Sequence, residues 1–564
     1  MAAQLTFQEL QKRSNYRFEC YRTTAAQPRE DVDYQTPAYH NFACPKPGFY
    51  PGVQPVAQLF SAPLYPSLHP SVHDPVQGLP PAMAADVKAA RERVRARLLP
   101  RRLEWSKDLG VGGNGLASLF SINDATHHGN RRRYFVAKAN HRQTASANAA
   151  LAREQALTDR FRHAMHVVQS PDWASVPVRD QWRPAQVPPP TDVMLLEYCE
   201  RGSLYKALCT AQTRGLKFPE RALWHMFHCL IQACVAMAHP PQNNLPLYGI
   251  NPPNAPDRLL MEKISDSEDP DPFVHFDIDP QNILVGKNEP GSDHPLIPGL
   301  QLSDFGLAEE LEDWHYTDNQ YMLELRRMAK DRYFTPEQFS AQWDWIPLNE
   351  GPGTMNPRPE VAGNYGWKSN LFQMALVMAS LITRCYPYRP PIPGWTGVPG
   401  RPLDPWYYGE EDDMDEDDSD DDMDDYHDGD NDGYDDDGYL RVWTYGRYLL
   451  DQHENDKNKP DAERRYGHVS FDLVWLVAAC LCDNPRYRPG LSWLEAKVSG
   501  HIERKWGGGR ANNPPDNDNS DGRMRDFIRD CFDSPPPSAP GNGGGGGGGG
   551  GRPGGRVVWE RGRG

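Results

Sequence analysis

The pattern of apolar and polar positions divides the chain into a strand-rich part followed by a helix-rich part. Residues 103–120 predict a strand, a glycine turn and a second strand, and residues 134–138 predict another strand after a polar loop. The continuous apolar run at 193–198 predicts a buried strand. Residues 145–168 carry apolar positions at helical spacing, and residues 82–99 predict a helix that becomes strongly basic toward its end.

Beyond the buried strand most apolar positions recur at helical spacing. Helices are predicted over 221–238, 370–383, 471–482 and 491–498, with short strands at 283–285 and 300–303. Insertions interrupt this part at 240–272, 286–299, 341–360 and 384–440. Strands first and helices later are typical of an α+β fold, here a bilobal one with a small strand-rich lobe and a large helical lobe.

These patterns predict four segments. Residues 1–100 form a largely irregular N-terminal extension with the basic helix near its end, residues 101–198 the strand-rich lobe and residues 199–503 the helical lobe. The helical lobe includes a disordered acidic insertion at 409–438. Residues 504–564 are poor in apolar residues and contain nine consecutive glycines, which predicts a disordered tail.

Composition indicates how much of the chain is folded and in which compartment the protein is expected. Hydrophobic residues make up 38% of the 564 residues, enough for a core but low for a chain that is folded throughout. The ten cysteines include no C-x-x-C pair, which is typical of a reducing compartment. No secretory signal is visible at the N-terminus, and no apolar run is long enough to span a bilayer. We therefore expect a soluble intracellular protein, cytoplasmic or nuclear, without a membrane partner.

The net charge of −17 comes from one insertion. Residues 410–437 hold 19 aspartates and glutamates and no lysine or arginine, so that the rest of the chain is nearly neutral. Such a segment repels itself and could attract basic partners. The overall acidity therefore says nothing about the substrate. The basic, glycine-rich tail is expected to keep the chain in solution, and nucleic-acid binding is not expected.

Candidate chemistry begins with a glycine-rich turn between the first two predicted strands. In LGVGGNGLA, residues 109–117, the glycines Gly110, Gly112 and Gly115 would let backbone N–H groups approach phosphates closely. Lys138 follows 23 residues after Gly115 at the end of a strand, and Glu154 lies on the next helix. A Lys–Glu pair of this kind holds the lysine against the α- and β-phosphates of ATP.

The strongest motifs are HFDIDPQNILV at 275–285 and SDFGLA at 303–308. In these stretches the chain resembles the eukaryotic protein kinase family, with its catalytic loop H-R-D-x-K-P-x-N and its metal-binding D-F-G. The resemblance covers about residues 103–500, and it implies that 101–198 and 199–503 are the kinase N-lobe and C-lobe. It also implies that Asp277 orients and deprotonates the substrate hydroxyl, while Asn282 and Asp304 hold Mg²⁺.

Further segments resemble the same family. MLLEYCERGSL at 194–204 is similar to the hinge between kinase lobes, where the backbone of Glu197 and Cys199 would hold the adenine. LCDNPRYRP at 481–489 resembles D-P-x-x-R-P, in which Arg488 would pair with a buried glutamate at the end of the activation segment. The spacing to the helix at 370–383 favours Glu360 as that glutamate, but the aromatic-Thr-Pro-Glu context favours Glu337, which we prefer.

Three positions depart from the family. Phe276 replaces the arginine that usually meets a phosphate on the activation loop, which suggests that activity does not depend on loop phosphorylation. Asp279 replaces the lysine that neutralises the moving phosphoryl group in serine/threonine kinases. Its carboxylate should repel the γ-phosphate unless it binds a metal or a basic substrate group. Asn370 replaces an aspartate and keeps a hydrogen-bond acceptor for the catalytic loop.

The sequence thus predicts an ATP- and Mg²⁺-dependent kinase acting on serine and threonine hydroxyls of a protein substrate. Its catalytic set is Lys138, Glu154, Asp277 and Asp279, with Asn282 and Asp304 as metal ligands. Two alternatives remain open. One is a weak or inactive pseudokinase that serves as a scaffold, and the other is a small-molecule phosphotransferase of the aminoglycoside or choline kinase type.

Overall fold

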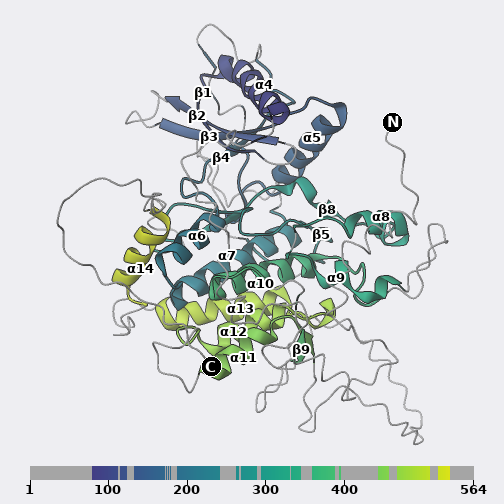
Figure 1. Cartoon of the computed structure of the whole chain (residues 1–564), viewed down its shortest axis with the longest axis vertical. Coiled ribbons are helices and arrows are strands. Elements are labelled where there is room, and N and C mark those ends of the chain that lie inside the picture. The colour runs from purple at the N-terminus through teal and green to yellow at the C-terminus, as the bar shows by residue number, and fades with distance from the viewer. Residues whose placement is uncertain are drawn as a thin grey trace, which may run out of the picture.

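The structure is a computed structural model of the chain. It describes residues 79, 81–111, 115–123, 132–171, 173, 176, 178–179, 187–241, 262–265, 269–288, 294–330, 332–344, 359–387, 391, 393–395, 442–456, 466–507 and 519–533. The acidic insertion predicted at 409–438 lies outside these residues, as does most of the N-terminal extension. The described part is a mixed α+β structure, with a four-stranded sheet at one end and a group of helices at the other (Figure 1).

The sheet is antiparallel, and its strands lie side by side in chain order. They are β1 (Glu104–Val111), β2 (Gly115–Asn123), β3 (Arg132–Asn140) and β4 (Met194–Glu197). Helix α5 (Ala145–Arg160) contacts β3 and β4. The inward residues of the strands, among them Phe120, Phe135 and Leu195, form one buried apolar cluster.

Helix α4 (Pro81–Leu98) packs on this sheet, close to the range predicted from its sequence. Its buried positions, Val87, Ala90, Val94 and Leu98, lie three or four residues apart and so form a single face. Val94 and Leu98 belong to the same apolar cluster as the strands. The basic helix that the sequence placed at the end of the N-terminal extension therefore packs as part of the sheet region.

The helical region surrounds helix α7 (Glu220–Ala238), of whose 19 residues 15 are buried. A single apolar cluster joins α7 to the helices α6 (Leu204–Arg214), α10 (Trp367–Thr383), α11 (Arg447–Asp456), α12 (Phe471–Cys480) and α13 (Leu491–Ile502). Short helices α8 (Asn319–Leu325) and α9 (Pro336–Phe339) lie in the segment before α10.

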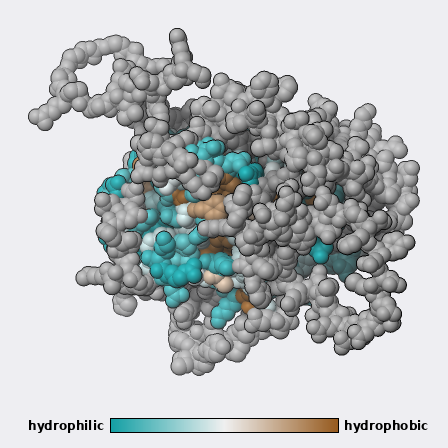
Figure 2. All heavy atoms as spheres, turned by 90° about the horizontal axis from the view of Figure 1, so that it is seen from below, coloured by the Kyte–Doolittle hydropathy of each residue, from teal (hydrophilic) through white to brown (hydrophobic). Residues whose placement is uncertain are grey.

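Seen from the end opposite the sheet, the described surface shows hydrophilic residues around a few apolar ones (Figure 2). Among the described residues, no helix combines the length and apolar character needed to cross a membrane.

Three pairs of short antiparallel strands complete the helical region. They are β5 (Phe273–Val274) with β8 (Glu309–Glu310), β6 (Ile283–Val285) with β7 (Leu300–Leu302), and β9 (Gly394–Trp395) with β10 (Trp443–Thr444). The β6–β7 pair encloses the segment that the sequence marked as an insertion at 286–299. Two of the candidate catalytic and metal-binding residues, Asp277 and Asn282, follow β5, and a third, Asp304, follows β7.

The prediction that all of 504–564 is disordered is wrong for residues 519–533. Helix α14 (Asp521–Ile528) and the following turn bury Met524, Phe527 and Phe532 in the apolar cluster of the helical region. Phe527 packs edge-on against Phe218 with ring centroids 5.3 Å apart. The apolar residues recur at helical spacing, but the polar and glycine-rich residues around them hid this short pattern in the composition.

A buried ion pair joins the end of the segment before α10 to the chain after α12. Arg488 donates to both carboxylate oxygens of Glu337 at 2.7 and 2.9 Å, and neither side chain is exposed. Ser369, in the first turn of α10, donates to Glu337 as well, at 2.7 Å. The preference for Glu337 as the partner of Arg488 is thereby confirmed. Glu360 is exposed and accepts a hydrogen bond from Asn484.

Replacing Glu337 by Gln should therefore destabilise the protein strongly. The change leaves the Arg488 guanidinium buried without its counter-charge, and breaking a buried pair in this way costs about 3–5 kcal/mol. The measurement is the midpoint of urea unfolding, with thermal unfolding as a second probe. The matched control is Glu360→Gln, which should cost less than about 0.5 kcal/mol because its carboxylate is exposed. Equal shifts in the two variants would contradict the structure.

Candidate active site

Lys138 is the point at which three segments meet. It lies in β3, and its Nζ is 2.6 Å from Oε1 of Glu154 and 2.8 Å from Oδ1 of Asp304. Glu154 belongs to the buried face of α5, and Asp304 follows β7. Burial lowers the pKa of Lys138, but the two carboxylates outweigh burial and raise it. The charged ammonium group therefore connects the sheet, α5 and the segment that carries Asp304.

The backbone around Asp304 is shaped to present its carboxylate. Asp304 has a φ of 68°, in the left-handed region that residues other than glycine seldom adopt. Phe305 is buried, with its ring centroid 5.0 Å from that of Phe161. A methyl group on Gly306 would lie 3.2 Å from Oδ1 of Asp304 and 3.6 Å from Oε2 of Glu154. Glycine at this position thus leaves room for the two carboxylates.

Two amides of α10 hold the backbone that leads to Asp277. Asn370 accepts from the backbone N–H of His275 at 2.8 Å and donates to the carbonyl of Phe273 at 2.7 Å. Gln373 donates to the carbonyl of Phe276 at 3.1 Å. The prediction that Asn370 keeps a hydrogen-bond acceptor for this loop is confirmed. These bonds fix the loop on a helix that is buried from its third residue onward.

Asp277 and Asn282 face each other within the same loop. Nδ2 of Asn282 donates to the carbonyl and to Oδ2 of Asp277, at 2.7 and 2.8 Å. Oδ1 of Asp277 is buried and has no hydrogen-bond partner among the described residues. Burial raises the pKa of Asp277 to about 7, opposed by Lys330 and supported by Asp279 and Asp304. A carboxylate with an unpartnered oxygen and a pKa near neutrality suits a general base.

Asp279 is turned into the loop and is neutralised by a lysine. Its Oδ1 accepts from the backbone N–H groups of Gln281 and Asn282, at 2.5 and 3.3 Å, and the residue is only 2% exposed. Its Oδ2 forms an ion pair with Nζ of Lys330, which also lies 3.5 Å from Oδ2 of Asp277. Burial lowers the pKa of Lys330, but Asp279 and Asp277 outweigh it and raise the pKa. The repulsion expected of an isolated carboxylate at this position is therefore reduced.

Phe276 has become part of an apolar cluster. It is 1% exposed, has a φ of 62°, and meets the ring of Tyr365 edge-on at 5.2 Å. The cluster also contains Val274, Leu311, Met322, Leu323, Leu325, Trp343 and Ala362. The segment between Asp304 and α10 is thus held to the loop by apolar contacts, at the position where the motif that the sequence resembles has an arginine.

The glycine-rich turn is described only at its two edges. Gly110 pairs with Ala117 across β1 and β2, and an added methyl group there would meet nothing within 4 Å. A methyl group on Gly115 would lie 3.3 Å from the carbonyl oxygen of Ala139, so that position favours glycine. Gly112 lies outside the described residues.

Glu197 and Cys199 use their side chains within the protein. Oε1 of Glu197 accepts from the backbone N–H of Gln169 at 2.7 Å and from Nε2 of Gln301 at 2.9 Å. The thiol of Cys199 donates to Oε1 of Gln301 at 3.2 Å. These contacts fasten the end of β4 and the residues after it to β7.

The site as a whole carries an excess of negative charge. Four carboxylates, from Glu154, Asp277, Asp279 and Asp304, share two ammonium groups, from Lys138 and Lys330. When Asp277 is ionised, two negative charges remain without a basic partner in this group. Such a set of oxygen atoms suits a hard divalent cation.

Lys330 is the functional candidate that sequence reasoning missed. It lies 53 positions after Asp277, in no motif and in no regular element. The only signal was indirect, because Asp279 places a second carboxylate beside Asp277 and so calls for a nearby cation. The chain offers many lysines and arginines, and the sequence does not say which of them folds back.

Comparison with known proteins does not assign the chain to a family. The chain matches none of the protein-family models, and no curated protein matches it with statistical significance. What the protein does is therefore inferred from the geometry of the site.

Proposed function

We propose that the chain is a protein kinase that transfers the γ-phosphate of ATP to serine and threonine hydroxyls of protein substrates. In this proposal the sheet region and the helical region are the two lobes of a kinase fold. One observation carries it. Lys138, Glu154 and Asp304 form a single ion-paired group, and Asp304 is close enough to Asp277 to raise its pKa. These residues come from segments far apart in the chain and match the family's motifs in order.

Asn282 and Asp304 would hold the magnesium ions. Oxygen is the ligand that Mg²⁺ prefers, and the surplus of two negative charges fits a divalent cation. Because Nδ2 of Asn282 donates to Asp277, its Oδ1 is the atom left to act as a ligand. When bound, magnesium would neutralise charge on the transferred phosphoryl group.

The remaining residues would position ATP and the acceptor hydroxyl and would remove the proton from that hydroxyl. Lys138, held by Glu154, would contact the α- and β-phosphates of ATP, and the backbone of Glu197 and Cys199 would hold the adenine. Asp277 would orient the acceptor hydroxyl and take its proton through the unpartnered Oδ1.

Lys330 would supply the positive charge that the family places at position 279. Its Nζ lies beside the carboxylate of Asp277, where the acceptor hydroxyl and the moving phosphoryl group would meet. Asp279 would then be a positioning residue that holds Lys330 in place. The lysine is supplied by the segment before α9, and the departure at 279 is compensated by a residue from another part of the chain.

Transfer of labelled γ-phosphate from Mg-ATP to generic protein substrates and to the protein itself tests the proposal. Asp277→Asn should reduce transfer at least about 100-fold, because the amide cannot accept the proton. Its ATP-induced thermal shift should stay close to that of the wild type.

The other outcomes separate the alternatives. ATP binding without transfer to any acceptor would favour a scaffold. Transfer to an aminoglycoside or an amino alcohol, but not to protein, would favour a small-molecule phosphotransferase. Equal transfer by the wild type and by Asp277→Asn would contradict the role of Asp277.

The Lys330→Met variant should lower kcat by about 100-fold, as the loss of one charged group at a reacting centre does. Burial holds the pKa of Asp277 high and Lys330 lowers it, so that removing Lys330 raises this pKa further. The rise of kcat/KM with pH, which requires ionised Asp277, should therefore move to higher pH. Full pH–rate profiles of the two proteins check this.

Two further variants control the Lys330 measurement. Lys497→Met removes an exposed lysine of α13 and should leave the profile unchanged. Asp279→Lys combined with Lys330→Asp exchanges the charges and should recover part of the activity. A wild-type profile in Lys330→Met would remove Lys330 from the site.

Activity should not require phosphorylation of the segment after Asp304. The hydroxyl of Tyr316 already donates to the carbonyl of Tyr365 at 2.8 Å, and Thr335 is buried in the turn that begins α9. Tyr316→Phe, Thr317→Ala and Thr335→Ala, each made alone and assayed for initial rate, should keep activity within about tenfold of the wild type, because no phosphate on them is needed to order the segment. Loss of activity in any one of them, with the fold intact, would contradict this.

A further inference from the structure

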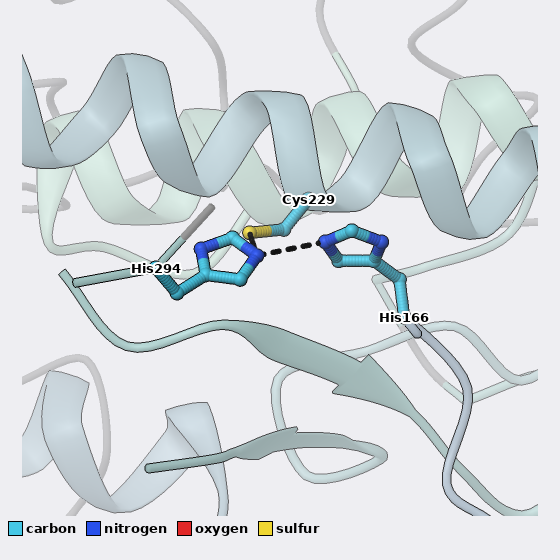
Figure 3. A group of neighbouring side chains, drawn as sticks. All are labelled: His166, Cys229 and His294. Carbon is cyan, nitrogen blue, oxygen red and sulfur yellow. Dashed lines mark hydrogen bonds between the residues drawn. The ribbon is translucent and has the colours of Figure 1, made fainter. Parts of the chain in front are cut away.

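A buried group of two histidines and one cysteine lies in the helical region, apart from the candidate active site. His166, Cys229 and His294 each offer one ligand atom, and these atoms lie within 4.8 Å of one another. Nε2 of His166 is 3.1 Å from Nε2 of His294, which is 3.9 Å from Sγ of Cys229. Figure 3 shows the three side chains converging, Cys229 from a helix and the imidazoles from loops. None of the three residues is more than 7% exposed.

Glu262 fixes which nitrogen of His166 faces the group. One of its oxygens accepts from the backbone N–H of His166, and the other lies 2.7 Å from Nδ1 of the ring. With Nδ1 held by the carboxylate, Nε2 is the ring nitrogen of His166 that faces His294 and Cys229. A carboxylate behind a histidine in this way is the usual support of a metal-binding imidazole.

The thiol of Cys229 faces the two imidazoles from α7, with its Sγ 3.9 Å from Nε2 of His294. Cysteine sulfur and histidine nitrogen are common ligands of metal ions in proteins. Cys234 lies five residues further along α7 and is equally buried, but it does not belong to this group.

We propose that His166, Cys229 and His294 bind a zinc ion. With zinc–nitrogen bonds of about 2.05 Å and a zinc–sulfur bond of about 2.3 Å, the two separations correspond to angles at the metal of about 98° and about 127°. Both are within reach of a tetrahedral site by small side-chain movements. The three residues leave one coordination position, which a water molecule would fill.

The ligand types select zinc over other cations. Magnesium and calcium require oxygen ligands, and the carboxylate of Glu262 is already engaged by His166. Imidazole with thiolate suits zinc, which has no preferred geometry of its own and so tolerates unequal angles. Zinc binds the deprotonated forms of the two imidazoles and the thiol, so any proton that occupies a ligand atom leaves when the ion binds.

The chain makes room for one of these ligands with a glycine. A methyl group on Gly299 would lie 2.9 Å from Cδ2 and 3.3 Å from Nε2 of His294. Gly299 is the residue directly before β7. The ring of His294 therefore packs on the backbone of the chain that leads to Asp304.

The ion would join three segments that are distant in sequence. His166 lies in the loop after α5, Cys229 on α7 and His294 before β7. The loop after α5 already pairs with β7, since Leu302 donates to the carbonyl of His166 at 2.8 Å and accepts from Val168 at 2.9 Å. Zinc would fix the loop that follows Glu154 against the strand that precedes Asp304. This structural role does not depend on the function proposed above.

The first test is the metal content of the full-length protein, prepared without chelators. We expect about one zinc ion per chain in the wild type and in Cys234→Ser, and a loss of most of it in Cys229→Ser. Gly299→Ala keeps all three ligands but displaces His294, and should release zinc to a chelator faster than the wild type. Stripping zinc from the wild type should lower the midpoint of thermal unfolding by at least about 5 °C.

A second measurement covers the case in which Cys229→Ser fails to fold. Cobalt loaded into the stripped wild-type protein should give a thiolate-to-cobalt charge-transfer band, and X-ray absorption at the zinc edge should show one sulfur among nitrogen and oxygen neighbours. A wild-type chain that carries no zinc and gives no cobalt band would overturn the proposal and leave a hydrogen-bonded polar group. Copper in place of zinc, or zinc retained unchanged in Cys229→Ser, would overturn it as well.

Discussion

Four carboxylates concentrated around Asp277 and Lys138 are the constraint on which the candidate site depends. Glu154 and Asp277 are largely removed from water, and like charges at such distances repel unless cations lie between them. Lys138 forms ion pairs with Glu154 and Asp304, and Lys330 forms ion pairs with Asp279 and Asp277. Each lysine comes from a different segment, so the sheet, α5 and the segment before α9 must all be in place before the charges are balanced. A divalent cation would balance the two negative charges that remain.

The rigid parts of the helical region hold these charged groups where they are. Asn370 and Gln373 bind the loop backbone from α10, and the ion pair of Arg488 with Glu337 fastens the segment that carries Lys330. Because both anchors are fully buried, the loss of either one would destabilise the whole fold. The ring of His294 packs against Gly299, the residue directly before β7, and Asp304 follows the same strand.

Two positions at which the sequence departs from the kinase motifs that it resembles have partners in three dimensions. Phe276 packs with Tyr365 and their apolar neighbours, so that apolar contacts hold it to the segment before α10. Asp279 accepts two backbone N–H groups and pairs with Lys330. Each substitution therefore has a partner elsewhere in the chain, and neither removes one of the residues expected to bind ATP or magnesium.

The sequence by itself determined the order of strands and helices and the short-range chemistry. The strand that ends near Lys138, the helix that carries Glu154, and the five-residue spacing from Asp277 to Asn282 follow from periodicity and local motifs. Tertiary structure alone decided that Lys330 pairs with Asp279, that three separate segments bring His166, Cys229 and His294 together, and that α14 packs on the helical region. The physical reason is that local patterns fix which face of an element is apolar, while a charge or ligand finds its distant partner only when whole elements pack.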